Sequence, residues 1–465
     1  MTITATKHTI GYKELLQKQK EYFNAGKSKP IAFRVEMLEK IKRLLKQYEP
    51  ALYKAVYEDF GKSEFETYAT ELGIVYHEIK LNIKNIKKWS KPQKVSTGLA
   101  NFPAKSYIIP EPLGNVLVIG PWNYPIHLSI LPAMAALAAG NTVILKTSEL
   151  PAKTSAVIAD LINSNFPPEL FYVVEGGVEA NTRLLELKFD KIFFTGSVPV
   201  GKIVYQAAAK NLVPVTLELG GKSPTFVFAD CNLKTTVKRL VWAKFINAGQ
   251  TCVAPDYVLV EESIQDKFIS AVKAEIEKYH KNKNDIEENY LRIINDRHFD
   301  RLSKLIDNNK LCHGGITNKE NRFISPTVLN NVTFDDPVME DEIFGPVLPL
   351  IPFAHIDDAI KMVKSRPKPL SLYVYSNNRK NIRKILNEIS FGGGAVNDSV
   401  MHVSNSKLPF GGVGTSGIGS YHGKAGFDCF SHHKSILDKL FWLEPPLKYP
   451  PYSKWKLSVI RWLLE

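Results

Sequence analysis

The sequence predicts an α/β protein whose centre is a doubly wound parallel sheet. Between residues 114 and 217, short apolar runs typical of buried strands alternate with helical patterns five times. A second α/β unit begins after Gly221, and a further strand–helix rhythm runs through 347–390. The stretch 92–112 differs, because proline and glycine interrupt every helical pattern there. Such alternation is typical of a doubly wound sheet, which binds ligands at the carboxyl ends of its strands.

The individual elements follow in chain order. Residues 11–90 are predicted to be helical, since apolar residues in 31–45 recur at helical spacing. Residues 92–112 are predicted to form an extended arm with a short strand at 106–109. The strands predicted for the first sheet are 116–119, 142–145, 171–174, 191–194 and 214–217. Between them, helices are predicted at 126–139, at 152–165, up to about 187, and at 198–210. The second unit is predicted to hold strands 224–228 and 257–260 and helices 233–245 and 263–280.

Composition excludes several classes of protein. The net charge is +13, but the lysines are spread along the chain, and no zinc-finger or RNA-binding aromatic motif accompanies them. A solvated basic surface is therefore favoured over a nucleic-acid partner. The four cysteines form no C-x-x-C pair, so neither a disulfide framework nor a metal site is predicted. The first residues lack an apolar signal core, and the apolar run at 128–140 is too short to span a bilayer, so we expect a soluble, cytoplasmic protein.

Two segments carry residues suited to covalent catalysis. Cys252 follows a Gly-Gln turn, and Glu218 lies in a glycine-rich turn 34 residues earlier. A thiol can capture a carbonyl group, and a carboxylate can then activate the water that releases the product. On these segments alone, a buried structural cysteine and a solvated loop glutamate are the commoner alternatives.

Three glycine-rich segments resemble phosphate-binding motifs. Residues 412–417 match G-x-G-x-x-G by letter but open no strand–turn–helix unit, so a tight loop beside a pocket is favoured. Residues 221–223 resemble the end of a P-loop, yet the first glycine that this motif needs is replaced by Thr216. The segment 194–201 lies between a strand and a helix, where backbone N–H groups can hold a pyrophosphate; an ordinary strand–helix turn is equally compatible with it.

Taken together, seven blocks of sequence resemble the aldehyde dehydrogenases over nearly the whole chain. They are Gly120-Pro-Trp-Asn-Tyr-Pro125, Lys146-Thr-Ser-Glu149, Phe194-Thr-Gly-Ser197, Leu217-Glu-Leu-Gly-Gly-Lys222, Gly249-Gln-Thr-Cys252, Glu342-Ile-Phe-Gly-Pro346 and Leu408-Pro-Phe-Gly-Gly-Val413. The segments 292–298, 324–328, 421–424 and 431–432 are similar to the class 3 enzymes, which include the fatty aldehyde dehydrogenases.

The resemblance implies the following catalytic roles. Cys252 would be the nucleophile that forms a thiohemiacetal and then a thioester. Asn123 and the backbone N–H of Cys252 would stabilise the developing oxyanion, and Glu218 would activate the hydrolytic water. The substrate would be a medium- or long-chain aliphatic or an aromatic aldehyde.

The resemblance also implies an NAD cofactor, with NADP as an alternative. Glu342 would hold the nicotinamide ribose and Phe344 would line the nicotinamide, whereas Lys146 and Glu149 would contact the adenosine ribose. A carboxylate beside a ribose 2′-hydroxyl favours NAD. The remaining residues expected in the cofactor cleft are Trp122, Gly196, Ser197, Gly201, Leu219 and Gly220.

The implied organisation is a homodimer built from a Rossmann-like cofactor domain, a catalytic domain and a small β oligomerisation arm. The cofactor domain would comprise 1–90 and 113–217, the catalytic domain 218–415, and the arm 91–112 and 416–445. The arm segments near 86–112 and 425–440 are expected to pair across the dimer interface. Residues 446–465 form a tail that ends in a basic amphipathic helix. Packing of this helix on the protein's own core is favoured over contact with a membrane surface or a cap over the substrate funnel.

Two rival functions follow from the same residues. In an acylating enzyme, coenzyme A would take the acyl group, but a base for water would then be unnecessary, and Glu218 is retained. The other rival is a non-catalytic binding protein, against which the intact Cys252, Glu218 and Asn123 argue.

Overall fold

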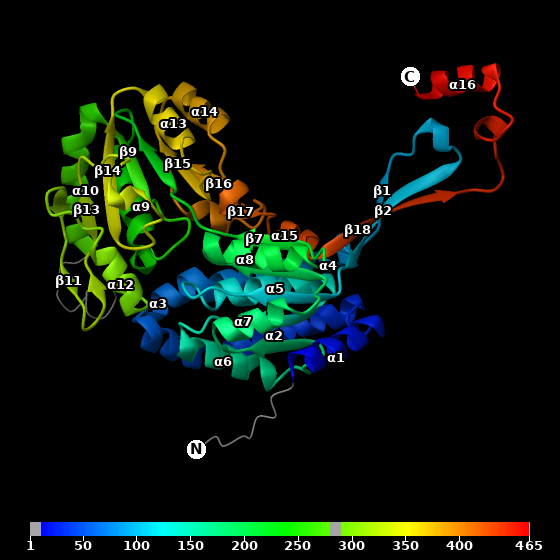
Figure 1. Cartoon of the computed structure of the whole chain (residues 1–465), viewed down its shortest axis with the longest axis horizontal. Coiled ribbons are helices and arrows are strands. Elements are labelled where there is room, and N and C mark those ends of the chain that lie inside the picture. The colour runs from blue at the N-terminus through cyan, green and yellow to red at the C-terminus, as the bar shows by residue number, and fades with distance from the viewer. Residues whose placement is uncertain (1–10, 280–289, 465) are drawn as a thin grey trace.

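The computed structural model describes residues 11–279 and 290–464. It contains two parallel-dominated sheets with helices on both faces, and a three-stranded arm that projects from the body (Figure 1). The α/β prediction is therefore confirmed. The predicted helix end at His280 and the expectations for the first eight residues lie outside the described residues.

The first sheet has the strand order β17-β7-β6-β3-β4-β5. Its strands are β3 (Asn115–Ile119), β4 (Thr142–Lys146), β5 (Phe171–Val174), β6 (Lys191–Thr195), β7 (Val215–Glu218) and β17 (Gly417–Ile418). All pairings are parallel except β17 with β7. The strand order reverses beside β3, so the carboxyl ends of β3 and β6 flank the topological switch point where ligands bind in such sheets.

Buried strands supply side chains to two hydrophobic clusters, one on each face of this sheet. Along β3, Val116 and Val118 enter one cluster while Leu117 and Ile119 enter the other. The first cluster includes α2 (Ile31–Phe60), α4 (Gly73–Trp89), α5 (His127–Ala139) and α6 (Ala152–Asn163). The second includes α1 (Tyr12–Asn24), α7 (Val178–Leu185) and α8 (Val198–Ala209). Successive side chains of a strand point to opposite faces, and both faces of this sheet are buried, so nearly every residue of these strands is apolar.

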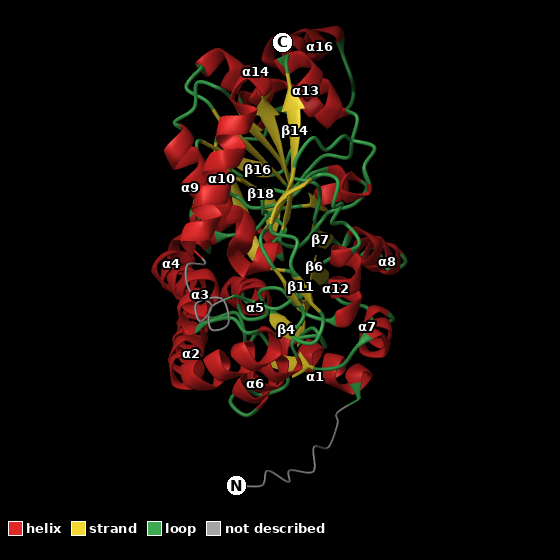
Figure 2. Ribbon diagram, turned by 90° about the vertical axis from the view of Figure 1, so that its left-hand side faces the viewer, coloured by secondary structure: helices red, strands yellow, loops and turns green. Residues whose placement is uncertain are grey.

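The second sheet has the order β10-β13-β14-β9-β8-β15-β16. Its strands are β8 (Pro224–Val227), β9 (Tyr257–Glu261), β10 (Leu311–His313), β13 (Thr327–Leu329), β14 (Val347–Phe353), β15 (Ser371–Tyr375) and β16 (Gly393–Val396). Its helices are α9 (Leu233–Phe245), α10 (Gln265–Tyr279), α12 (Asp296–Ser303), α13 (Ile356–Lys364) and α14 (Arg379–Glu388). A two-stranded ribbon adds β11 (Thr317–Asn318) and β12 (Phe323–Ile324). Figure 2 shows the two sheets as successive lobes of the body.

The arm corrects one prediction. It consists of β1 (Gln93–Val95), β2 (Ala104–Pro112) and β18 (Ser431–Lys439), and β18 pairs with β2 within the same chain, from Ser431↔Pro112 to Lys439↔Ala104. The expected pairing of these two segments across a dimer interface is therefore wrong. Residues 417–429 lie against the body, as β17 on β7 and as α15 (Gly423–Cys429) on α4 and α5, so the arm sheet is shorter than 416–445.

The tail corrects a second prediction. Helix α16 (Lys454–Leu464) lies at the outer end of the arm, where it contacts the 3-10 turn η2 (Leu99–Asn101) rather than the core of either sheet (Figure 1). Packing on the protein's own core, the favoured expectation, is wrong because α16 leaves Trp455 and Trp462 largely exposed. None of the described helices combines the length and the apolarity needed to cross a membrane.

Candidate active site

Glu218 is the last residue of β7 and is 2% exposed. Both of its carboxylate oxygens are buried without a hydrogen-bond partner among the described residues. Burial raises the pKa of this carboxyl well above its usual range. A buried acid without partners is costly for folding, and residues of this kind concentrate at functional sites.

The glycine-rich segment 412–417 lies directly beside Glu218. Gly417 pairs with Glu218 between β17 and β7, and Ser416 accepts a hydrogen bond from the Leu219 N–H at 3.1 Å. A Cβ atom on Gly417, whose φ is +155°, would lie 2.4 Å from the carbonyl oxygen of Leu217. The expectation of a tight loop is therefore confirmed, while its role beside a pocket stays a prediction. The segment ends in β17 and does not open a helix after a strand, so the letter match to a dinucleotide motif is incidental.

Cys252 follows a strained turn between α9 and β9. Asn247 and Ala248 have left-handed backbone, with φ of +54° and +50°. Such conformations are uncommon for residues other than glycine and persist where the surroundings hold them. Here Gln250 provides the support, because its side chain donates to the carbonyls of Asn247 and Arg292 and accepts from the N–H of Ile294. This loop turns Cys252 toward the end of the first sheet.

Asn123 faces the same loop from the turn after β3. Its side-chain amide donates to the carbonyl of Gln250 at 3.0 Å, and its own carbonyl accepts from the side chain of Asn247 at 3.0 Å. One hydrogen of the Asn123 amide therefore fixes the side chain to Gln250, and the second hydrogen on the same nitrogen can be donated to an oxyanion. The structure therefore brings the predicted oxyanion donor and the predicted nucleophile onto two adjoining turns.

The electrostatics of Cys252 link it to both predicted glutamates. Burial, followed by the carboxylates of Glu342 and Glu218, raises the pKa of the thiol well above its usual range, while backbone N–H groups of Cys252 and Val253 act in the opposite direction. A thiolate is the reactive form of cysteine. The surroundings of Cys252 therefore favour the thiol over the thiolate.

This raised pKa gives a testable pH dependence. Below the pKa of the thiol, each unit of pH increases the thiolate fraction about tenfold. We expect the rate of Cys252 alkylation by iodoacetamide to rise steadily from about pH 6 to pH 9 without levelling off, since a free thiol levels off near ~8.5. Peptide mass spectrometry would assign the labelled residue, and Cys231→Ala would serve as the control. A plateau of the labelling rate anywhere below about pH 9 would contradict the expected raised pKa, because a free thiol levels off near ~8.5.

Aromatic rings mark the predicted nicotinamide end of the cleft. The ring of Trp122 lies 5.3 Å from that of Phe344 and 5.5 Å from that of His298. Glu342 lies close by, and a Cβ atom on Gly220 would be 1.9 Å from its carboxylate, which explains the need for glycine there. Burial, together with Asp256, raises the pKa of Glu342 to about 8.

The opposite end of the predicted cleft is formed by the carboxyl ends of β4 and β6. Ser197 begins α8 without a side-chain cap, so the first N–H groups of this helix remain available to an anion. Glu149 is 45% exposed, whereas Lys146 is buried and donates to the Thr147 carbonyl at 2.5 Å. A Cβ atom on Gly201 would lie 2.6 Å from Leu219, and one on Gly196 would lie 2.6 Å from the ring of Phe194. A larger residue at either position would therefore require Leu219 or Phe194 to shift.

The chain's residues fit a dinucleotide on two counts. The helix N-terminus suits a pyrophosphate, and three apolar side chains on α7 and α8 are exposed beside it, as an aromatic base requires. They are Val178, Val200 and Ile203. The sequence did not identify these three residues, because a single valine or isoleucine on a helix does not indicate a binding surface until the positions of α7 and α8 are known.

Sequence reasoning also missed several residues around Cys252. Tyr373 donates to the carbonyl of Val253 at 2.6 Å, and Tyr124 and Thr251 share a hydrogen bond of 2.6 Å. His422 and Phe410 stack with ring centroids 5.3 Å apart. Some lie inside the matching blocks, but only the fold shows that their side chains converge. Within the described parts of the chain, no cluster of histidine, cysteine or acidic residues could hold a metal ion.

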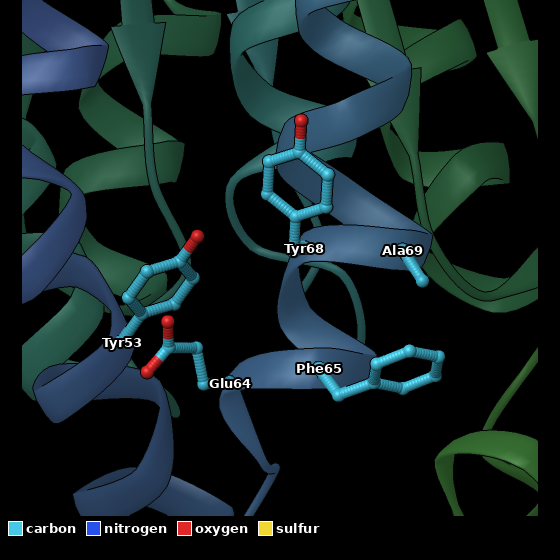
Figure 3. Close-up of a pocket in the computed structure, with 5 residues that line it drawn as sticks. All are labelled: Tyr53, Glu64, Phe65, Tyr68 and Ala69. Carbon is cyan, nitrogen blue, oxygen red and sulfur yellow. The ribbon is translucent and has the colours of Figure 1, made fainter.

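A separate hollow of about 520 Å³ lies on the outer surface of α2 (Ile31–Phe60) and α3 (Glu64–Thr67) (Figure 3). It is lined by Tyr53, Glu64, Phe65, Tyr68 and Ala69, none of which belongs to the predicted site. Its shallow, exposed lining gives no reason to place the chemistry there.

Comparison with known proteins identifies the family of the chain. The model of the aldehyde dehydrogenase family matches residues 4–436. The chain is 48% identical over 436 residues to the 4,4'-diaponeurosporen-aldehyde dehydrogenase of Staphylococcus aureus, with 93% of this chain and 95% of that protein covered. It is 44% identical over 440 residues to the dimeric NADP-preferring aldehyde dehydrogenase of Rattus norvegicus, with 94% and 97% covered.

The fold agrees as well. The solved structure of Staphylococcus aureus AldH in a substrate-bound state aligns with a TM-score of 0.96 at 46% identity, covering 98% of this chain and 100% of that one. Family 3 members occur among the relatives at similar identity, which confirms the class 3 type. The chain therefore belongs to the aldehyde dehydrogenase family and is an NAD(P)-dependent oxidoreductase that acts on aldehydes.

Proposed function

We propose that this enzyme oxidises medium- or long-chain aliphatic or aromatic aldehydes to carboxylic acids through a thiohemiacetal and a thioester on Cys252. The observation that carries the proposal is the burial of Glu218, whose carboxylate oxygens have no partner among the described residues and whose charge raises the pKa of the Cys252 thiol. A nucleophile and a base for water in one enclosed site match the two halves of this reaction.

The chain's residues divide the work as follows. The Cys252 thiolate attacks the aldehyde carbon, and the Asn123 amide and the Cys252 N–H stabilise the resulting oxyanion. NAD(P), when bound in the predicted cleft, would supply the acceptor for the hydride that leaves the substrate carbon. Glu218 then takes a proton from water, which attacks the thioester and releases the acid and the Cys252 thiolate. Overall, aldehyde, NAD(P)⁺ and water give acid, NAD(P)H and a proton.

The cofactor is proposed to be NAD, with NADP as the alternative. The exposed carboxylate of Glu149 lies at the end of β4 and favours a free ribose 2′-hydroxyl over a phosphate. The rat relative is named NADP-preferring, so NADP is tested alongside NAD.

Coenzyme A is less well supported than water as the molecule that takes the acyl group from Cys252. Transfer to a thiol needs no base for water, yet the structure buries Glu218 beside Cys252 in spite of its cost. If coenzyme A raised turnover and replaced water as the acceptor, the acylating function would be correct instead.

The assembly is proposed to be a cytoplasmic homodimer. The rat relative is named dimeric, and the arm of this chain projects from the body with Leu437 and Phe441 exposed (Figure 1). The described cysteines are all free, as expected in a reducing compartment. The division into cofactor domain, catalytic domain and arm remains part of this proposal.

The tail is proposed to contact an anionic lipid surface that supplies apolar aldehydes. Trp455 and Trp462 on α16 and Trp442 at the arm tip are 56%, 77% and 68% exposed, and Lys454 and Arg461 add positive charge. Exposed tryptophan beside basic residues is typical of helices that lie in a membrane interface.

Deleting residues 454–465 should therefore lower kcat/KM for long aldehydes by about tenfold or more and leave short aldehydes nearly unchanged, because only long chains reside in lipid. The assay would compare aldehydes of increasing chain length. Co-sedimentation with phosphatidylglycerol vesicles should be lost in the same variant. If the deletion lowered kcat/KM equally at every chain length, both a lipid-contact role and a cap role would be refuted. If it lowered kcat/KM for long aldehydes only, but the full-length protein did not bind vesicles, the tail would act as a cap.

The test of the function is cofactor reduction followed by absorbance at neutral pH. Purified protein would be given NAD or NADP with short aliphatic, long aliphatic and aromatic aldehydes. Reduced cofactor and an equal amount of carboxylic acid are expected. No reduction of either cofactor with any aldehyde would overturn the proposal.

A further inference from the structure

A buried ion pair lies behind the active site in the segment between α2 and α4. Lys62 donates to Glu71 at 2.8 Å, and both side chains are fully buried. Lys62 follows Gly61, whose left-handed backbone ends α2. Glu71 belongs to the π-helical turn η1 (Tyr68–Leu72), a conformation that is found mostly as a single turn at functional sites.

The second oxygen of Glu71 holds the start of α5. It accepts hydrogen bonds from the N–H groups of Ile126 and His127 at 2.8 and 3.2 Å. A carboxylate at a helix N-terminus satisfies unpaired N–H groups and complements the helix dipole. Because α5 begins directly after the turn that carries Trp122 and Asn123, Glu71 fixes the position at which that turn ends.

Lys62 connects the pair to the loop of the nucleophile. Its ammonium lies 4.3 Å from the centre of the Tyr124 ring, and the hydroxyl of Tyr124 is bonded to Thr251, the residue before Cys252. The same carboxylate–ammonium pair therefore reaches both turns of the active site, one through the backbone and one through Tyr124.

A third ionisable residue supports the same loop. Glu66 accepts from the N–H of Asn247 at 2.7 Å, and the side chain of Asn247 donates in turn to the carbonyl of Asn123. Glu66 thus holds a residue whose backbone is strained. Together with the contacts of Lys62 and Glu71, this hydrogen bond is the third point at which the segment 62–71 meets the site.

We propose that Glu71, with Lys62 as its buried counter-charge, is a positioning residue that holds the oxyanion turn at Asn123, and through that turn the Cys252 loop, in reactive register. The inference rests on the proposed roles of Asn123 and Cys252. Stability alone does not explain the pair, because well-packed apolar side chains in place of a buried ion pair are often equally stable. Misplacement of reacting groups by about 1 Å, in contrast, costs on the order of 10²-fold in rate.

Two double variants separate positioning from stability. Lys62→Met with Glu71→Gln removes both charges but keeps an oxygen to accept from Ile126 and His127. Lys62→Met with Glu71→Leu removes the acceptor as well. We expect the first to keep kcat within about threefold of wild type and the second to lose about tenfold to 10²-fold, with KM for NAD changed by less than about twofold. Lys310→Met, which breaks the pair with Asp336 in the second sheet's lobe, is the control.

Coupling to Asn123 gives the second criterion. If the pair acts through the oxyanion turn, Lys62→Met/Glu71→Leu should cost much less in an Asn123→Ala background than in wild type. Equal costs in both backgrounds, equal kcat for the two double variants, or a large change in KM for NAD alone would overturn the proposal. Should the Leu variant fail to fold, Lys62→Met with Glu71→Asn decides, because the shorter side chain withdraws the acceptor from the N–H groups of Ile126 and His127 and should lower kcat without changing KM for NAD.

The outcome is separable from that of the proposed function. Iodoacetamide labelling of Cys252 does not require aldehyde oxidation. If wild type oxidised no aldehyde, an altered labelling rate in the Leu variant and an unaltered rate in the Gln variant would retain the positioning role and reject the function. Equal rates in all three proteins would reject both.

Discussion

Replacement of Cys252 by alanine is expected to lower aldehyde oxidation by about six orders of magnitude, as loss of a nucleophile does in another covalent enzyme. Without the thiol no thiohemiacetal forms, and the hydride has no activated carbon to leave. The change deletes one sulfur atom from a loop fixed by Gln250 and Asn123, so the backbone should be retained. The measurement is the steady-state rate of cofactor reduction with saturating aldehyde.

Cofactor binding provides the control for this variant. The residues predicted to hold the dinucleotide lie at the ends of β4, β6 and β7, so Cys252→Ala should bind NAD with a Kd within about threefold of wild type by titration calorimetry. Cys231→Ala removes a thiol that lies in the core beside α9 and should keep full activity. Retained oxidation in Cys252→Ala, or equal loss in Cys231→Ala, would exclude Cys252 as the nucleophile.

The fold was predictable because each sheet rests on local patterns. The apolar run at 116–119 became β3, and the run at 214–217 became β7 shifted by one residue, so that Glu218 ends the strand. Context also separated the glycine motifs, since only 194–201 joins a strand to a helix. Fully buried parallel strands leave few alternatives for such segments.

The arm and the tail were harder, because their partners are not encoded nearby. Residues 104–112 find β18 more than 300 positions later, and nothing in either strand specifies whether the pairing is within or between chains. The amphipathic pattern of 454–464 predicts a helix but not the surface on which it lies. A sequence pattern predicts the local structure of a segment. The pairing of β2 with β18 and the position of α16 depend instead on the assembled fold.

The support behind the site was invisible for a different reason. Lys62 and Glu71 look like ordinary charged residues at the ends of surface helices, and such charges are usually solvated. Only the packing of the π-helical turn against α5 buries them. The reacting residues could be identified from sequence blocks, but the residues that hold them in place required three-dimensional contacts.

Glu218→Gln is expected to separate the two halves of the reaction. The amide has nearly the shape of the carboxylate but cannot take a proton from water, so the thioester should form and then persist. One equivalent of NADH per active site should appear rapidly, followed by a steady rate lower by about 10²–10⁴-fold, the usual contribution of a general base. Stopped-flow absorbance would resolve the burst, and Cys252→Ala, which forms no thioester, should show none.

A nucleophile stronger than water tests the cause of this slow phase. Hydroxylamine attacks a thioester without a general base, so it should accelerate the steady rate of Glu218→Gln far more than that of wild type and yield the hydroxamate of the acyl group. Burial raises the pKa of Glu218 well above its usual range, so the fraction that can act as a base grows over a higher range of pH than for an ordinary carboxyl. The wild-type steady rate should therefore rise with pH where hydrolysis limits turnover, and the variant should lose that rise. A variant that retains the full steady rate and its pH dependence would show that another group activates the water.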